Sequence, residues 1–496
     1  MRVPETLLTQ LADFVSTRTG LHFTGERMND LENGIRHAAA EYGFKDIETC
    51  IKWLVTSPLT RQEVEILASH LTIGETYFFR EIKYFEILEK HIIPELIRSR
   101  SGNEKYIRIW SAGCATGEEP YSIAILLDKM IPDLKEWNIT ILATDINPHF
   151  LRKAQDGLYS EWSFRGSPSW IRKYFTRTKE GFSILPEIKK MVTFSYHNLA
   201  EDAYPTLLNN TNGMDIILCR NVLMYFSQER AKQVAQALYL CLVDNGWLAV
   251  SPVETSHVLF SQFAAINFPD AIFYKKDISK SQRIEEFPED NPVQKEIRTA
   301  PIGLVPEQII IAVPEKKIEP KEEKIPGSEY NEVMALYVQG KYMRVTEILT
   351  DLVSHDNDTK AMILLSKAYA NYGKSAQALE WCEKALAIDS LDSCSHYLHS
   401  IILQERGHVE EAIKSLKRAI YLDQDFVLAH FALGNFCRQI GKIKESNRHF
   451  ENVLALLGKR RNDEILPESE GITAGRLFEI ITTMKGKEMG HDITGR

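Results

Sequence analysis

Short apolar stretches separated by helical patterns organise the middle of the chain. Residues 107–110 (IRIW), 139–143 (ITILA) and 215–219 (DIILC) predict buried β-strands. The first stretch runs into a turn of small residues at 111–117 (SAGCATG), and the apolar run 121–127 that follows predicts a helix. A strand, a small-residue turn and a helix form the first βα unit of a nucleotide-type pocket, so the pattern predicts a Rossmann-like α/β domain.

Polar residues follow the first two predicted strands, at the edge of the sheet where such folds bind ligands. The turn places Gly113 and Gly117 ahead of Glu118 and Glu119. Two carboxylates at a helix N-terminus would repel a pyrophosphate, which favours a cationic or hydroxyl-rich ligand. Asp145, at the end of the second strand, is placed to accept hydrogen bonds from ribose hydroxyls. The turn taken alone also fits a structural alternative, a tight strand–helix connection with a satisfied cap.

The third predicted strand brings further polar residues to the same edge. Arg220 and Asn221 come directly after it, and Tyr225 follows shortly. Ligands lie beyond the carboxyl ends of parallel strands. We therefore expect these three side chains to face the crevice that also holds Gly113 and Asp145.

Helical patterns occupy the start of the chain. Helical spacing is present at residues 5–17, 26–42, 46–56 and 60–71, with glycine or proline between the segments. We expect a small helical domain over residues 1–72, ahead of the α/β domain over residues 73–276.

The composition changes abruptly after the α/β domain. Residues 277–327 are rich in Glu, Lys, Pro and Ile without a sustained period, which predicts a disordered linker. Beyond it, Gly373, Gly407 and Gly441 are spaced 34 residues apart, a period that looks like tetratricopeptide repeats. We expect an all-α solenoid over residues 328–457, with a groove for a further protein partner, and a tail over 458–496 that contains a capping helix at 470–484.

Overall composition narrows the class of protein. The formal net charge of −9 disfavours nucleic-acid binding, which needs a basic surface. No apolar run approaches the roughly 20 residues that span a bilayer, and the first residues do not resemble a signal peptide, so we expect a cytoplasmic protein without membrane insertion. Seven cysteines without a C-x-x-C pair indicate reduced thiols and no metal site. The oligomeric state is not readable from these features.

Four segments in this order resemble the CheR-type chemotaxis receptor methyltransferases: residues 71–81 (LTIGETYFFRE), 110–122, 145–147 and 219–226. The resemblance extends from residue 10 to about residue 275. It implies that S-adenosylmethionine esterifies glutamate side chains on the cytoplasmic helices of chemoreceptors and leaves as S-adenosylhomocysteine. It also implies a small β insert near residues 176–197, which the family uses for tethering to receptor tails.

The same resemblance implies which residues form the site. Besides Gly113 and Asp145, it places in the cofactor site Gly74, Thr76, Arg80, Glu119, Asn198, Leu199, Arg220 and Asn221. Gly74 departs from a pattern that often has asparagine there. We expect Arg80 to clamp the acceptor carboxylate, since a guanidinium pairs with a planar carboxylate in two places, and Tyr225 to lie near the reacting methyl group. The structural alternative makes Arg80 a helix cap and Tyr225 a core residue.

Three functions are compatible with these features. The first is a protein-glutamate O-methyltransferase whose repeats bring it to a signalling assembly. The second is a non-catalytic adaptor that senses S-adenosylmethionine while the repeats bind the partner. Methylation of a nucleic acid or small molecule is a third possibility, but the Arg220-Asn221-Val222 segment lacks the Pro-Pro-aromatic motif of amino-directed base methyltransferases.

Overall fold

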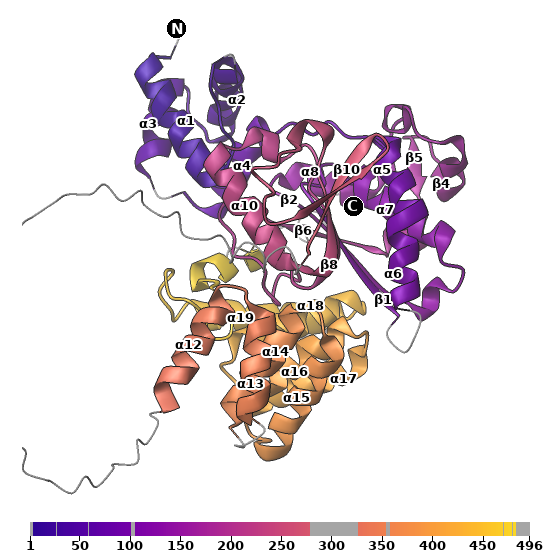
Figure 1. Ribbon diagram of the computed structural model, residues 1–496. Coiled ribbons are helices and arrows are strands. Elements are labelled where there is room, and N and C mark those ends of the chain that lie inside the picture. The colour runs from indigo at the N-terminus through magenta and orange to yellow at the C-terminus, as the bar shows by residue number, and fades with distance from the viewer. Residues whose placement is uncertain are drawn as a thin grey trace, which may run out of the picture.

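Helices, a mixed sheet and a second run of helices follow one another along the chain in the computed structural model (Figure 1). The structure describes residues 3–25, 27–57, 59–100, 105–277, 326–353, 358–469, 471–478 and 480–482. The predicted linker at 277–327 lies almost entirely outside the described residues. Among the described residues, no helix combines the length and apolar character needed to cross a membrane.

The four helices predicted at the start of the chain are present. They are α1 (Glu5–Thr19), α2 (Arg27–Glu41), α3 (Ile47–Thr56) and α4 (Arg61–Leu71). Side-chain caps fix the starts of two of these helices. Asp46 accepts a hydrogen bond from the Thr49 backbone at the start of α3, and Thr60 forms a capping box with Glu63 at the start of α4. Their buried apolar side chains form one core.

The central sheet has seven strands in the order β6-β2-β1-β7-β8-β10-β9. The strands are β6 (Val192–Tyr196), β2 (Asn138–Asp145), β1 (Tyr106–Ala112), β7 (Met214–Leu218), β8 (Leu242–Ala249), β10 (Ala271–Lys275) and β9 (Ala264–Phe268). The pairs from β6 to β8 are parallel, and β10 and β9 complete the sheet in antiparallel pairs. Strand β1 lies between β2 and β7, so the order reverses there and opens a crevice beyond the strand ends.

Alternate residues of β1 face the two sides of the sheet. Ile107 and Ile109 share a core with α6 (Ile93–Ser99) and α7 (Glu118–Met130). Trp110 shares the opposite core with α10 (Gln228–Cys241). This three-layer arrangement confirms the predicted Rossmann-like α/β fold.

The small β insert lies earlier in the chain than we predicted. A separate three-stranded sheet consists of β3 (Leu158–Tyr159), β5 (Phe182–Ile184) and β4 (Phe175–Arg177). Residues 192–196, which we assigned to the insert, instead pair with β2 at the edge of the central sheet. Strands of two or three residues carry too short an alternation to be located from the sequence.

The carboxyl-terminal part confirms the predicted all-α repeat solenoid. Its paired helices are α12 (Pro326–Val338), α13 (Tyr342–Val353), α14 (Thr359–Asn371), α15 (Ser375–Ile388), α16 (Ser393–Glu405), α17 (Val409–Leu422), α18 (Val427–Gln439) and α19 (Ile443–Leu457). Each pair turns at a glycine in the left-handed region, namely Gly340, Gly373, Gly407 and Gly441 with φ of 71° to 80°. That backbone conformation is what the repeated glycine supplies.

Residues 474–478 and 480–482 of the predicted capping helix are helical. Leu477 and Ile481 are fully buried in a core shared with Phe450 of α19. This part of the tail therefore packs against the last repeat.

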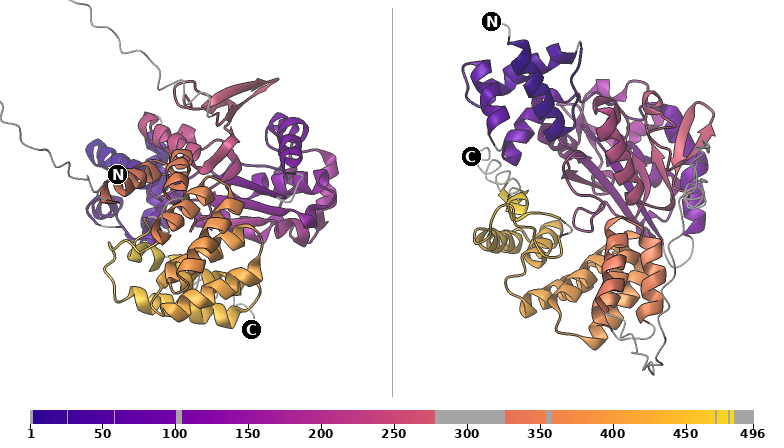
Figure 2. Two further views of the ribbon diagram at one scale, coloured as in Figure 1. Left: turned by 60° about the horizontal axis from the view of Figure 1, so that its bottom comes forward. Right: turned by 60° about the vertical axis from the view of Figure 1, so that its left-hand side comes forward.

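The solenoid packs against the amino ends of the central strands, as Figures 1 and 2 show from three sides. The Tyr106 hydroxyl, at the start of β1, donates to the Gly373 carbonyl at 2.9 Å. The Asn138 amide, at the start of β2, donates to the Glu405 carbonyl. Asn212 donates to the Glu405 carboxylate at 2.9 Å. The turns of successive repeats thus contact the edge of the sheet opposite the crevice.

We predict that Gly373→Ala destabilises the chain more than Gly441→Ala does. Both glycines have nearly the same left-handed φ (77° and 78°), so both substitutions carry the same backbone strain. A Cβ at Gly373 would lie 2.4 Å from Val243 Cγ1, whereas one at Gly441 would meet nothing within 4 Å. The extra cost at Gly373 should be about 1–3 kcal/mol, measured by calorimetric unfolding of the full chain. Equal losses in the two variants would show that the contact between repeats and sheet contributes nothing.

Candidate active site

The turn after β1 approaches the loop after β7 so closely that it needs glycine. Gly113 has φ of 81°, and a Cβ there would lie 2.4 Å from Val222 Cγ2. The backbone N–H groups of Gly113 and Cys114 donate to the Thr144 carbonyl at 2.8 and 2.9 Å. The turn is therefore fixed between the end of β2 and the loop that follows β7.

Asp145 is buried at the end of β2 and holds the turn through its carboxylate. One oxygen accepts from the Ala115 N–H at 2.9 Å, and the other accepts from the Asn147 N–H at 2.8 Å. Burial raises the pKa of Asp145 from 3.8 to about 6, although these backbone hydrogen bonds oppose the rise. The carboxylate is thus preorganised, with lone pairs left for a ligand in the crevice.

The loop after β7 is held by a residue that the sequence analysis missed. Glu254 accepts from the backbone N–H groups of Asn221 (2.8 Å), Val222 (2.7 Å) and Met224 (3.2 Å). Asn221 itself has a left-handed φ of 59°. The available signal was the Ser-x-x-Glu pattern at 251–254, a capping-box signature that the structure confirms.

Six predicted residues line one cavity at the carboxyl ends of β1, β2 and β7. They are Gly113, Asp145, Asn198, Leu199, Asn221 and Tyr225. The helical domain closes the cavity with Thr19 and Leu21. The Tyr225 carbonyl accepts from the His22 N–H at 2.7 Å, which ties this wall to the amino-terminal domain. The strand ends therefore converge as the sequence pattern indicated.

Arg27 is a second residue that the sequence analysis did not assign to the site. Its guanidinium carbon lies 5.1 Å from the centre of the Tyr225 ring and 4.7 Å from that of Phe23. It brings a positive charge from α2 to the tyrosine side of the cavity.

Arg220 and Glu119 do not line the cavity but form a buried ion pair beside it. The Arg220 guanidinium donates to Glu119 at 3.0 Å and to Glu81 at 2.7 Å, with only 2% of its side chain exposed. It also donates to the Arg80 carbonyl at 2.7 Å. Ser111 donates to the other Glu119 oxygen at 2.7 Å. We expected Arg220 to face the crevice, and the structure corrects this: its two Nη groups donate to two carboxylates and a carbonyl beside the cavity.

The remaining predicted residues lie on the segment before α5 (Ile82–Ile87). Arg80 is half-buried and donates to the Glu75 carbonyl, and the Thr76 carbonyl accepts from Arg165 at 3.4 Å. A Cβ on Gly74 would lie 2.5 Å from the Phe150 ring, which itself lines the cavity. A side chain at position 74 would therefore require the Phe150 ring to move.

Comparison with known proteins fits this geometry. A family model described as the CheR methyltransferase SAM binding domain matches residues 74–269, and one described as a TPR repeat matches residues 402–446. The chain is 30% identical over 279 residues to chemotaxis protein methyltransferase 2 of Vibrio cholerae, covering 55% of this chain and 94% of that protein. It is 31% identical over 252 residues to the chemotaxis protein methyltransferase of Borreliella burgdorferi, covering 50% of this chain and 87% of that protein. The chain belongs to the chemotaxis protein methyltransferase family.

Membership in this family confirms several predictions. The enzyme class, protein-glutamate O-methyltransferase, and the cofactor, S-adenosylmethionine, are as the sequence indicated. The second match confirms the repeats, a type of module that serves protein interaction. The cavity described above lies within the matched S-adenosylmethionine-binding region, apart from its amino-terminal wall.

We predict that S-adenosylhomocysteine affinity falls below about pH 6 and is constant above about pH 7. We expect ribose hydroxyls to bind the ionised Asp145 carboxylate, which accepts hydrogen bonds more strongly than the protonated form, and its pKa of about 6 means that acid protonates it in this range. His197 lines the same cavity and burial lowers its pKa, so the Asp145→Asn variant, which keeps His197, separates the two titrations. Calorimetric titration should show affinity falling by about tenfold per pH unit at the acid end. Asp145→Asn should bind more weakly with no such dependence, and an unchanged pH profile in this variant would contradict the assignment.

We predict that Glu254→Gln lowers the free energy of unfolding by about 1.5–3 kcal/mol. The amide replaces one acceptor oxygen by a donor, which then faces backbone N–H groups that Glu254 now satisfies. Glu229→Gln, on an exposed position of α10, is the matched control. Urea unfolding measures both, and a loss no larger than in the control would show that the loop is not held by this carboxylate.

Proposed function

We propose that the chain transfers the methyl group of S-adenosylmethionine to glutamate side chains of chemoreceptor-like signalling proteins. The main support is the cavity at the carboxyl ends of β1, β2 and β7, which Asp145, Asn221 and Tyr225 line beneath the helical domain. The names of the relatives support a role in chemotaxis.

The residues of the cavity fit the cofactor. Asp145 is placed to accept the ribose hydroxyls, and the apolar side chains of Ile146, Phe150 and Leu199 can cover an adenine. The Glu119 carboxylate does not line the cavity, because Arg220 and Ser111 pair with its two oxygens; we therefore assign it to holding the start of α7 beside the glycine turn. We assign no phosphate contact, because two glutamates begin α7.

The chemistry needs positioning more than proton transfer. An ionised glutamate oxygen attacks the methyl carbon, the carbon–sulfur bond breaks, and S-adenosylhomocysteine leaves with the bonding electron pair on sulfur. Neither step requires a base, so orientation of the two reactants supplies the main acceleration, on the order of 7–11 kcal/mol for well-aligned groups.

Three side chains are proposed for the acceptor side. Tyr225 lines the cavity, Arg27 lies over its ring, and Arg80 lies on the neighbouring segment that Arg220 anchors. We assign the carboxylate clamp to Arg80. Its half-buried side chain donates to a neutral carbonyl, that of Glu75, and can exchange this hydrogen bond for one to a carboxylate.

The repeats are proposed to bind a protein of the same signalling assembly. They pack at the amino ends of the strands, through Tyr106 and Asn138, whereas the cavity lies at the carboxyl ends. A partner on the repeats and an acceptor at the cavity can therefore be held at the same time.

We predict that Arg80→Ala lowers methyl transfer to receptor-containing membranes at least about 100-fold, while S-adenosylhomocysteine still binds. Labelled cofactor and release of methanol in alkali measure the ester, and calorimetric titration on the same preparation measures binding. Arg152→Ala, an exposed arginine on α8 (Pro148–Asp156), is the matched control and should retain activity.

The assay also separates the alternatives. Label that survives alkali would exclude a carboxyl ester. Cofactor binding without any transfer by the unsubstituted chain would favour the adaptor. An active Arg80→Ala enzyme would end the assignment of the clamp.

A further inference from the structure

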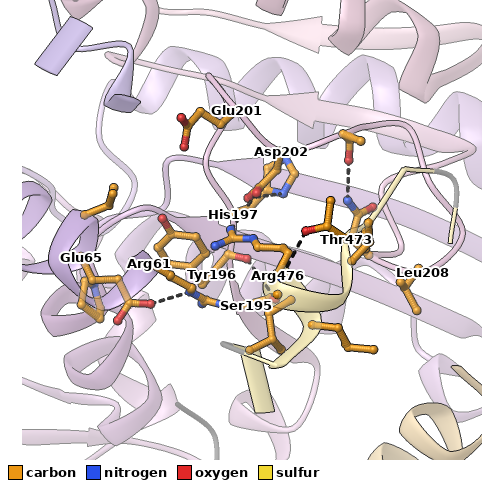
Figure 3. Close-up of a pocket in the computed structure, with 18 of the residues that line it drawn as sticks. Arg61, Glu65, Ser195, Tyr196, His197, Glu201, Asp202, Leu208, Thr473 and Arg476 are labelled. Atoms are coloured by element: carbon orange, nitrogen blue, oxygen red, sulfur yellow. Dashed lines mark hydrogen bonds and ion pairs between the residues drawn. The ribbon is translucent and has the colours of Figure 1, made fainter. Parts of the chain in front are cut away.

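The loop at residues 197–202 forms part of the cofactor cavity and also faces a second, larger cavity. His197, Asn198 and Leu199 line the cofactor cavity. His197 and Asp202 line a cavity of about 1000 Å³ on the other side (Figure 3). Helices of the amino-terminal domain, the central sheet and the carboxyl-terminal segment all contribute to its walls. The loop is therefore the junction of all three parts of the chain.

Asp202 determines the shape of this loop. Its Oδ2 accepts from the Asn198 N–H at 2.7 Å and lies 3.6 Å from His197 Nδ1. The Asn198 side chain, in turn, donates to the Arg18 carbonyl at 2.8 Å and accepts from the Ala200 N–H at 3.0 Å. The carboxylate thus fixes the backbone of a residue that lines the cofactor cavity.

The carboxyl-terminal segment reaches this carboxylate through one side chain. Arg476 Nη2 donates to Asp202 Oδ1 at 2.7 Å, and the two side chains are only 24% and 18% exposed. The same guanidinium lies 5.2 Å from the ring of Tyr196, the last residue of β6. Arg476 belongs to the short helix whose Leu477 and Ile481 are buried against the last repeat. A continuous series of contacts therefore runs from α19 through Leu477, Arg476 and Asp202 to Asn198.

We infer that Arg476 is a positioning residue through which the repeats set the affinity of the cofactor site. With Arg476 in place, the loop at 197–202 is held in the conformation that lines the cofactor cavity. A protein that binds the last repeat and displaces this segment weakens cofactor binding, and by linkage the cofactor strengthens the docking of the segment. The inference rests on the proposed function for the assignment of Asn198 and Leu199 to the cofactor.

The test is calorimetric titration of S-adenosylhomocysteine into variants of the full chain. Arg476→Met should weaken binding at least about fivefold, the lower end of typical coupling between sites. In receptor methylation it should raise the KM for S-adenosylmethionine with little change in kcat, because Arg476 does not reach the cofactor cavity. Arg476→Lys, which keeps the charge, should recover part of the affinity.

Two further variants identify the route. Arg461→Met removes an exposed ion pair with Asp463 in the same carboxyl-terminal segment, 81% exposed at the arginine, and should bind as the unsubstituted chain does. Adding Arg476→Met to Asp202→Asn should weaken binding no further than Asp202→Asn alone, since both changes break one connection.

The results distinguish a failure of the inference about Arg476 from a failure of the proposed cofactor site. Unchanged affinity in a folded Arg476→Met chain, judged by circular dichroism, overturns the inference. So does additivity of the Arg476 and Asp202 effects. Absence of binding by the unsubstituted chain would instead overturn the proposed cofactor site.

Discussion

A single buried guanidinium holds the active site together. Arg220, at the end of β7, joins Glu119 at the start of α7, Glu81 before α5, and the carbonyl of Arg80. Its side chain is almost fully buried, so loss of the guanidinium would leave the largely buried Glu119 carboxylate without a counter-charge, at a typical cost of about 3–5 kcal/mol. This ion-pair network therefore joins the start of α7, the Arg80 segment and the end of β7, while Asp145 and Glu254 hold the glycine turn and the loop after β7.

The repeats and the proposed cofactor cavity lie at opposite ends of the central strands. Strand β1 begins at Tyr106, which contacts Gly373 of the repeats, and its last residue, Ala112, precedes Gly113 of the cofactor cavity. Strand β2 likewise begins at Asn138, which contacts the Glu405 carbonyl, and ends at Asp145. Because these strands are parallel, the repeats lie at their amino ends, and the cavity that we propose for the cofactor lies at their carboxyl ends. The carboxyl-terminal segment is the exception, since Arg476 returns to the loop at 197–202.

Features that depend on local sequence patterns could be predicted from the sequence. Apolar runs predicted β1, β2 and β7. The spacing of Gly373, Gly407 and Gly441 predicted the repeats, because each turn between paired helices needs a residue with positive φ at a fixed interval. The polar residues Asp145, Asn221 and Tyr225 were expected in one crevice from strand topology alone, and all three line it.

Contacts between segments far apart in the sequence could not be predicted, because no local sequence pattern marks them. Glu254 reaches Asn221 across 33 residues, and Arg476 reaches Asp202 across 274. Neither pairing has a period or spacing that a single sequence displays. The same limit applies to Arg220, which we expected in the crevice but which faces two carboxylates, and to Gly74, which lies against the distant Phe150 ring.

A crystal structure of the full chain with S-adenosylhomocysteine is the most direct test of the central claim, that the cofactor binds where the loops after β1, β2 and β7 meet. The account predicts ribose hydroxyls within hydrogen-bonding distance of the Asp145 carboxylate and the sulfur on the Tyr225 side of the cavity. A ligand bound elsewhere, or one whose ribose does not contact Asp145, would contradict it.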